Sequence, residues 1–479
     1  MTNNLKRRLQ TRHISMIAIG GSIGTGIFLA SGNAIHTAGP GGAILAYLII
    51  GIMVYFLMTS LGEMSTLIPV TGTFCDYSAR FVDPALGFAM SYNYWFNWAI
   101  TVAVDLSSAS FIMSYWFPHV PFLLWSAFFF CLVFAMNLLA VNLYGESEYW
   151  LSLIKVVTII FFIAIGFFMI IGVFGHQAVN FSNWVIGDAP FHDGWLGFTS
   201  VLLVAGFSFQ GTEIFGVTAG EAANPKESIP RAVKSVFWRI LLFYVLSMLV
   251  ISFLIPYTNN SLINASTQNV ALSPFTLVFQ KTGLPLAAAV VNAIMLTAVL
   301  SACSASMYTA TRVLWHIAKM GQAPSLFKKI SRKGLPINAL LATSSIGAFV
   351  FLSSIFGNGT IFLWLVNISA LAGFIAWIGI ALSHYRFRRA YIAQGKSLDD
   401  LPYLSKYFPF APIFALVLCL GIMIAQQFAV PTEHFNWGSF IATYVSIPAF
   451  LLLYFGYKIY KKTRIVPLKE CDFRYVENE

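Results

Sequence analysis

The chain has 479 residues, of which 58% are hydrophobic and only 10% are charged. Soluble globular proteins carry about 25% charged residues, so this composition excludes a soluble enzyme and indicates a protein that crosses a membrane many times. The net charge of +10 does not indicate nucleic-acid binding, because the basic residues cluster between apolar stretches, as the positive-inside rule predicts for cytoplasmic loops.

Twelve membrane-spanning helices are predicted, because apolar stretches of about 18 or more residues, each able to cross the hydrocarbon layer, recur along the whole chain. They run approximately over 14–34, 42–67, 85–115, 121–141, 147–173, 195–219, 232–256, 284–317, 338–356, 360–383, 409–429 and 438–459. Lysine and arginine precede the first span and follow the second, sixth, eighth, tenth and twelfth. We therefore expect both termini in the cytoplasm, with 1–13 and 460–479 as the terminal segments and no cleavable signal.

Five cysteines are spread along the chain without a paired or metal-ligand spacing. Most lie in or beside predicted spans, where a free thiol behaves as a small hydrophobe. We therefore expect no disulfide framework, no metal site and no cofactor.

The first span is interrupted by a glycine-rich segment, GGSIGTG, at 20–26. Glycine costs a helix about 1 kcal/mol relative to alanine, and unwound backbone at membrane depth is tolerated only inside protein or beside a watery cavity. Free N–H groups at the start of a half-helix favour an anion. The predicted carboxylate-binding residues are Ser22, Ile23, Gly24, Thr25 and Gly26. The alternative is a glycine surface for close helix packing.

A similar segment lies in the sixth span, at 206–215. It echoes the first break when one inserted residue, Gln210, is allowed, and it lies an odd number of spans away, so the two cross the membrane in opposite directions. Paired interruptions in two inverted halves mark the midplane binding site of secondary transporters. The alternative is a chance likeness between two glycine-rich apolar segments.

Four motifs resemble the bacterial amino acid permeases of the amino acid–polyamine–organocation superfamily, and they cover nearly the whole chain. They lie at 31–47, at 207–213 (FSFQGTE), at 224–231 (NPKESIPR) and at 301–312. The likeness is greatest to lysine-specific permeases, which segments 92–105, 237–244 and 383–391 resemble. The resemblance implies an all-α fold of two inverted five-helix repeats, 14–173 and 195–383, with broken first and sixth helices and two extra helices at 409–459. It also implies proton-driven uptake of L-lysine.

The second break is expected to expose backbone carbonyls suited to the α-ammonium of an amino acid. The residues expected at this end of the substrate are Ile19, Phe207, Ser208 and Phe209. The resemblance places an aromatic gate over the bound amino acid at Phe207. Packing of Phe207 in the core is the alternative.

One face of the third span is predicted to hold the substrate side chain. Its residues, at spacings i, i+4, i+7 and i+11, are Tyr94, Trp98, Thr101 and Asp105. A hydrophobic slot that ends in a carboxylate suits the four-carbon stem and ammonium of lysine, and Trp98 can offer its ring face to the cation. Asn97 and, from the eighth span, Ser304 are added to this pocket; Ser304 stands where these permeases often have asparagine. Ordinary helix packing is the alternative.

Ionisable residues within spans are functional candidates by default. Lys155 and Glu213 are predicted to carry the coupling proton, since a buried lysine readily exchanges its proton. The alternative for Lys155 is a structural ion pair with a carboxylate such as Glu146, Glu148 or Glu213. Glu63 is expected to anchor the inner end of the second span, Glu221 to join an inner gate, and Tyr308 to face the site.

Taken together, the residues and the resemblance predict a proton-coupled importer of L-lysine in the bacterial inner membrane. Its expected partners are L-lysine, protons and the lipid bilayer, with no nucleic acid. A broader cationic amino acid permease and a lysine/amine exchanger share every motif and stay open. A membrane enzyme is not expected, because no convergent nucleophile, base or metal set is present in the sequence.

Overall fold

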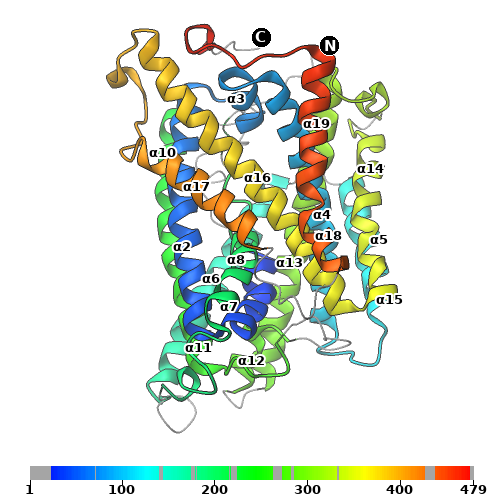
Figure 1. Cartoon of the computed structure of the whole chain (residues 1–479). Helices are drawn as coiled ribbons and strands as arrows, with labels where there is room; N and C mark the ends of the chain where they lie inside the picture. Colours follow the sequence, from blue (N-terminus) through cyan, green and yellow to red (C-terminus); the bar gives the residue numbers. More distant parts are fainter. Residues whose placement is uncertain are drawn as a thin grey trace.

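The computed structural model of the protein describes residues 23–70, 72–139, 144–173, 179, 181–214, 216, 219, 224–262, 272–281, 285–331, 334–426 and 437–474. Within these residues every regular element is a helix, and the long helices pack side by side into one bundle (Figure 1). The all-α prediction is confirmed.

Seven stretches of the described chain are helical, long and apolar enough to cross a membrane, or eight if one bent pair is a single span. The seven are Gly26–Leu67, Pro84–Met113, Tyr149–Ile170, Pro225–Leu254, Leu286–Lys319, Ile337–Phe356 and Asn358–Ala393. The bent pair is α18 (Trp437–Tyr444) and α19 (Ser446–Lys461), and three shorter apolar stretches are Phe122–Leu138, Gly194–Phe209 and Phe410–Ala425. The polytopic class is confirmed, and the count of twelve stays a prediction.

The first predicted break is where the described helix begins. Ile23 and Gly24 are irregular, the helix starts at Thr25, and η1 (Gly26–Ala30), a turn of π-helix, leads into α2 (Ser31–Leu67). Short π-helical segments are rare and frequently lie at functional sites. The earlier residues of this break lie outside the described chain.

α2 bends sharply near its start and so joins two predicted spans. Gly39 has a φ of 72°, which favours glycine, and Pro40 follows it. The carbonyl of Pro190, from the loop before the sixth span, accepts the N–H of Gly41 at 2.8 Å. This bond satisfies a backbone donor that the bend frees from the helix.

The sixth span is broken as predicted. α7 (Gly194–Ser200) and α8 (Leu202–Phe209) form its first half. At Gln210 the backbone becomes extended, with a ψ of 148°, and Gly211 has a φ of 90°. The helical hydrogen-bond pattern therefore stops at Phe209, and the predicted carbonyls lie in the last turn of α8.

α4 (Pro84–Met113) is the central helix of the bundle. It packs against α13 (Pro285–Lys319), α16 (Asn358–Ala393) and α5 (Phe122–Leu139). Most of its side chains are buried. α6 (Tyr144–Ile170) instead exposes a row of apolar side chains, as expected for a helix that borders the membrane. Among them are Ile154, Val157 and Phe161.

The remaining spans surround this centre. α10 (Pro225–Arg239), η4 (Ile240–Val245) and α11 (Leu246–Leu254) form the seventh predicted span. The ninth combines α14 (Ile337–Gly347), η6 (Ala348–Leu352) and α15 (Ser353–Phe356). The eleventh is α17 (Phe410–Ala425), which packs against α16 and α2. The short helices η2 (Phe181–Trp184), η5 (Ser325–Lys328) and η7 (Leu398–Asp400) lie between spans.

Two further short helices, α3 (Thr73–Phe81) and α12 (Pro274–Gln280), are absent from the sequence prediction. α16 also continues ten residues beyond the predicted end of the tenth span, to Ala393. α3 and the far end of α16 lie at the same end of the bundle as the C-terminal segment with η9 (Leu468–Glu470) (Figure 1).

Candidate functional site

The two helix breaks touch each other at the centre of the bundle. A Cβ atom added to Gly26 would collide with the backbone of Ser208, and it would lie 2.9 Å from the Ser208 Oγ. The hydroxyl of Tyr47, from α2, is 2.7 Å from the same oxygen. The N-terminal end of one half-helix therefore lies directly beside the C-terminal end of another. Such ends carry opposite partial charges, so together they suit a zwitterion.

Among the carboxylate-binding candidates, Gly24 and Gly26 lie in close contact with neighbouring helices. A Cβ on Gly24 would lie 3.3 Å from the Cβ of Ala302, on α13. Ile23 and Thr25 are buried. Ser22, like Ile19 at the ammonium end, lies outside the described residues.

Thr25 is hydrogen-bonded to the third-span carboxylate. Its hydroxyl donates to Oδ1 of Asp105 at 2.7 Å, and both side chains are 2% exposed. Ser306 of α13 lies 3.4 Å from the other carboxylate oxygen, although its shorter bond, 2.8 Å, goes to the carbonyl of Ala302. The structure thus places Asp105 against the first break.

Lys155, buried on α6, acts electrostatically on the same carboxylate. Its expected partners included Glu146, Glu148 and Glu213; the side chains of the first two lie outside the described part. Asp105 is thus one acidic group that lies within electrostatic reach of Lys155, and sequence spacing alone did not pair these two residues.

The middle of the third-span face is bound into a hydrogen-bond network. Ser369, on α16, donates to Oδ1 of Asn97 at 2.9 Å and lies 2.9 Å from the hydroxyl of Thr101. Gln210 donates through Nε2 to the carbonyl of Ser369 at 2.8 Å. The sequence did not indicate that Ser369 and Gln210 belong to the site. For Gln210, its place as a polar residue inside a helix break was a usable signal.

The other end of that face holds an aromatic and acidic group. The rings of Tyr94 and Phe74 are 4.9 Å apart, and those of Tyr94 and Trp98 are 5.9 Å apart. Glu213 acts electrostatically on Tyr94. The Tyr94 hydroxyl, Trp98 Nε1 and Glu213 Oε2 are buried, and none makes a hydrogen bond of normal geometry with a described residue, although Tyr94 interacts with Trp98 and Glu213 with Trp377. Buried polar atoms usually have a partner, so these three are suited to a bound polar group.

Arg239 is one of the basic residues that follow the sixth span in the sequence, and it lies within the predicted seventh span. It is 1% exposed and is in electrostatic contact with Tyr244 and Glu213. Its position among the apolar residues 236–245 was the sequence signal that it would be buried in a span. The side chains of Phe207 and Phe209 are buried, and Phe209 packs on Tyr244 with 4.2 Å between ring centroids.

The eighth-span candidates contact other groups. Asn137 of α5 donates to the hydroxyl of Ser304 at 3.2 Å. The guanidinium of Arg312 lies 4.1 Å from the ring centroid of Tyr308.

Glu63 forms a buried ion pair between α2 and α16. Its carboxylate accepts two bonds from Arg388, at 2.7 and 2.5 Å, and one from the Ser405 N–H at 2.7 Å. His384 Nε2 is 3.4 Å from it. Glu63 therefore anchors one helix to another; Glu221 lies outside the described residues.

The loop before the sixth span carries an acidic cluster. Asp188 accepts bonds from the Asp193 N–H, His192 and Tyr257, and these bonds hold the pKa of its carboxyl well below the usual range. Within the described chain, the side chains of Asp188, His192 and Asp193 are a group with metal-ligand atoms close together. The two aspartates are exposed and His192 is half-buried, and Asp188 is already bonded to both of the others.

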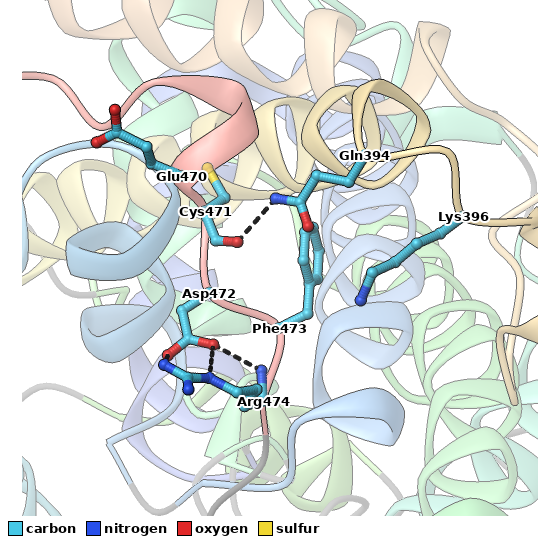
Figure 2. A pocket seen from close by; sticks show the side chains of 7 residues that line it. All are labelled: Gln394, Lys396, Glu470, Cys471, Asp472, Phe473 and Arg474. Carbon is cyan, nitrogen blue, oxygen red and sulfur yellow. Dashed lines mark hydrogen bonds and ion pairs between the residues drawn. The ribbon is translucent and has the colours of Figure 1, made fainter.

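A cavity of about 300 Å³ lies between the end of α16 and the C-terminal segment (Figure 2). Gln394 donates to the carbonyl of Cys471 at 2.8 Å, and Arg474 pairs with Asp472 at 3.0 Å. The Lys396 ammonium lies over the Phe473 ring, 4.7 Å from its centroid. The cavity lies where the C-terminal segment packs against the end of α16, and none of its lining residues belongs to the helix breaks.

Known proteins match the whole chain. A family model described as amino acid permease matches residues 13–470. The lysine-specific permease LysP of Escherichia coli (strain K12) is 54% identical, over 98% of this chain and 96% of that protein. The lysine-specific permease LysP of Lactococcus lactis subsp. cremoris (strain MG1363) is 50% identical, over 98% of this chain and 92% of that protein. The histidine permease HisP of that strain is 52% identical, over 98% of both proteins.

The fold matches a solved transporter as well. A manganese transporter of Eremococcus coleocola aligns with a TM-score of 0.60 and 12% identity, over 96% of this chain and 98% of that one. At this identity the match shows a shared fold and nothing about substrate.

Proposed function

Because the chain belongs to the amino acid permease family, we propose that it imports L-lysine together with protons across the bacterial inner membrane by alternating access. Family membership makes it a multi-pass membrane protein that transports amino acids, and permeases are not enzymes. The proposal adds the substrate, the coupling ion, and the cytoplasmic placement of both termini, which rests on the distribution of lysine and arginine.

The observation that carries the proposal is the contact between Gly26 and Ser208, which brings two opposed helix ends together. The N–H groups from Ile23 to Gly26, joined by Ser22, would hold the substrate carboxylate. The carbonyls from Phe207 to Phe209, joined by Ile19, would hold the α-ammonium, with Phe207 as the gate.

The side chain of lysine would extend towards Tyr94, Trp98 and Glu213. The Tyr94 hydroxyl, Trp98 Nε1 and Glu213 Oε2 lack hydrogen bonds of normal geometry among the described residues, whereas Glu213 Oε1 accepts the N–H of Gly211. The Tyr94 and Trp98 rings suit an alkyl stem and a cation, and the Glu213 carboxylate suits the terminal ammonium. Asn97 and Thr101 already bond to Ser369. We assign those two to holding the second break in place.

A second candidate substrate is histidine. HisP is 52% identical to the chain, between the 54% and 50% of the two LysP proteins. Overall identity therefore does not separate lysine from histidine. Lysine is favoured by the aromatic slot with its single carboxylate, which fits a permanently cationic side chain.

Competition of labelled lysine uptake in proteoliposomes tests the substrate. Unlabelled lysine and short-chain diamino acids should compete, while histidine and neutral amino acids should not, at both acid and neutral pH. Stronger competition by histidine than by lysine would replace lysine with histidine as the substrate. Equal competition by all cationic amino acids would support the broader cationic permease.

A further inference from the structure

The carboxylate of Asp105 lies beside the first break, where it is bonded to the side chain of Thr25. Its hydrogen-bond donor, Thr25, is the first residue of the helix that begins there, and the bond is 2.7 Å long. Asp105 is 2% exposed. A carboxylate at the start of a half-helix is the kind of anion that such a helix end attracts.

The groups that act on Asp105 come from three elements besides its own helix. Thr25 belongs to the first break, Lys155 to α6, and Ser306 and the Cys303 thiol to α13. Of these, Lys155 is the basic group and Cys303 is the other titratable one. The positive charge of Lys155 therefore favours the ionised form of the Asp105 carboxylate.

A substrate carboxylate at the same break would be a second negative charge beside the first. Two carboxylates that share a site cannot both stay ionised, because each disfavours the charge of the other. The Thr25 hydroxyl also has one proton, and it can donate to only one of the two anions. Binding of the substrate and ionisation of Asp105 therefore compete.

We propose that Asp105 is a proton-carrying residue of the transport cycle, and that its carboxyl must be protonated before the substrate carboxylate binds at the first break. A proton from the outer solution forms the O–H bond of Asp105 and neutralises it. When substrate leaves on the inner side, that bond breaks, the proton passes to inner water, and the carboxylate again pairs with Thr25 and Lys155. One proton moves with each substrate. This inference rests on the proposed proton-coupled uptake.

The test uses the full-length protein in proteoliposomes and compares wild type with Asp105→Asn, which imitates the neutral carboxyl. For wild type, lysine binding should weaken about tenfold for each pH unit above the midpoint. The variant should bind lysine with an affinity that does not change with pH. It should exchange lysine for lysine without a gradient, yet lose accumulation driven by a pH gradient.

Thr25→Val and Thr25→Ser provide a second test that leaves the carboxyl in place. Loss of the hydroxyl removes a bond that favours the charged form of Asp105, so the midpoint of pH-dependent binding should rise in Thr25→Val. Thr25→Ser keeps a hydroxyl and should keep the wild-type midpoint.

Two results would overturn the inference. One is an Asp105→Asn variant that still accumulates lysine with a pH gradient as wild type does; the other is a Thr25→Val midpoint equal to that of wild type. Wild-type lysine uptake that does not depend on pH or on a pH gradient would contradict the proposed function itself, and the inference that rests on it.

Discussion

Gly26 lies against the backbone of Ser208, in a space that admits no Cβ atom. This contact joins the first helix break to the second. The proposed binding of the substrate carboxylate and α-ammonium by backbone groups depends on it. Gly26→Ala should therefore separate the two breaks and destabilise the protein by about 1–3 kcal/mol, as overpacking does. We expect lysine uptake to fall to background.

Gly456→Ala is the matched control, because a Cβ there meets nothing within 4 Å. It lies in α19 and should gain up to about 1 kcal/mol from helix propensity. Measurement of uptake and thermal stability in both variants checks the pair. Normal uptake by Gly26→Ala would show that the contact is dispensable.

Tyr94→Phe tests the side-chain site without disturbing the fold. The deleted hydroxyl makes no hydrogen bond of normal geometry with a described residue, so stability should be unchanged. Lysine affinity should fall by about 0.5–1.5 kcal/mol, the net value of one hydrogen bond. Tyr460→Phe removes an exposed hydroxyl and should change neither quantity. Equal lysine affinity in all three proteins would remove Tyr94 from the site.

The buried pair of Glu63 and Arg388 predicts a double-mutant pattern. Arg388→Met leaves a fully buried carboxylate without its charge partner and should cost about 3–5 kcal/mol. The double variant Glu63→Gln with Arg388→Met should lose less, because no unpaired charge remains. Thermal unfolding in detergent measures both, and additive losses in the double variant would contradict a direct pairing.

Asp83 predicts a dependence of stability on pH. Burial alone would raise the pKa of this carboxyl, but bonds from Lys458, the Ala85 N–H and Thr463 outweigh it and hold the pKa below the usual value. The group therefore contributes stability above the ordinary aspartate pKa of about 3.9, and the contribution is lost as pH falls through the depressed value.

Asp83→Asn should accordingly be less stable than wild type at neutral pH, and the difference should shrink in acid. Unfolding temperatures across the acid range measure it. Asp472→Asn, at the exposed C-terminal segment, serves as the control and should be nearly neutral, since exposed pairs contribute little. A difference that stays constant with pH would contradict the role of Asp83.

The sequence predicted the helical class and both helix breaks, because glycine at membrane depth and apolar length are local signals. It did not predict which residues share one site. Tyr94 and Asp105 lie on one helix face, yet eleven residues of helix separate them by about 16 Å. In the structure, Tyr94 accordingly lies within electrostatic reach of Glu213, whereas Asp105 is hydrogen-bonded to Thr25.

Other features escaped because they depend on contacts between distant segments. Gln210 was read as an inserted residue, and only the fold shows it bonded to Ser369. The sequence places Arg239 next to the basic loop after the sixth span, and only the fold shows that its side chain is buried. The short helix α3 has only 9 residues and includes the charged Asp76 and Arg80, so a search for apolar stretches of span length did not reveal it.

Proton-coupled lysine uptake is tested most directly by an imposed pH gradient across proteoliposomes that hold the purified protein. With equal lysine on both sides and an alkaline interior, labelled lysine should accumulate inside while the interior acidifies in proportion. Lysine that only equilibrates, with no lysine-dependent acidification, would contradict the account and leave a uniporter or an exchanger.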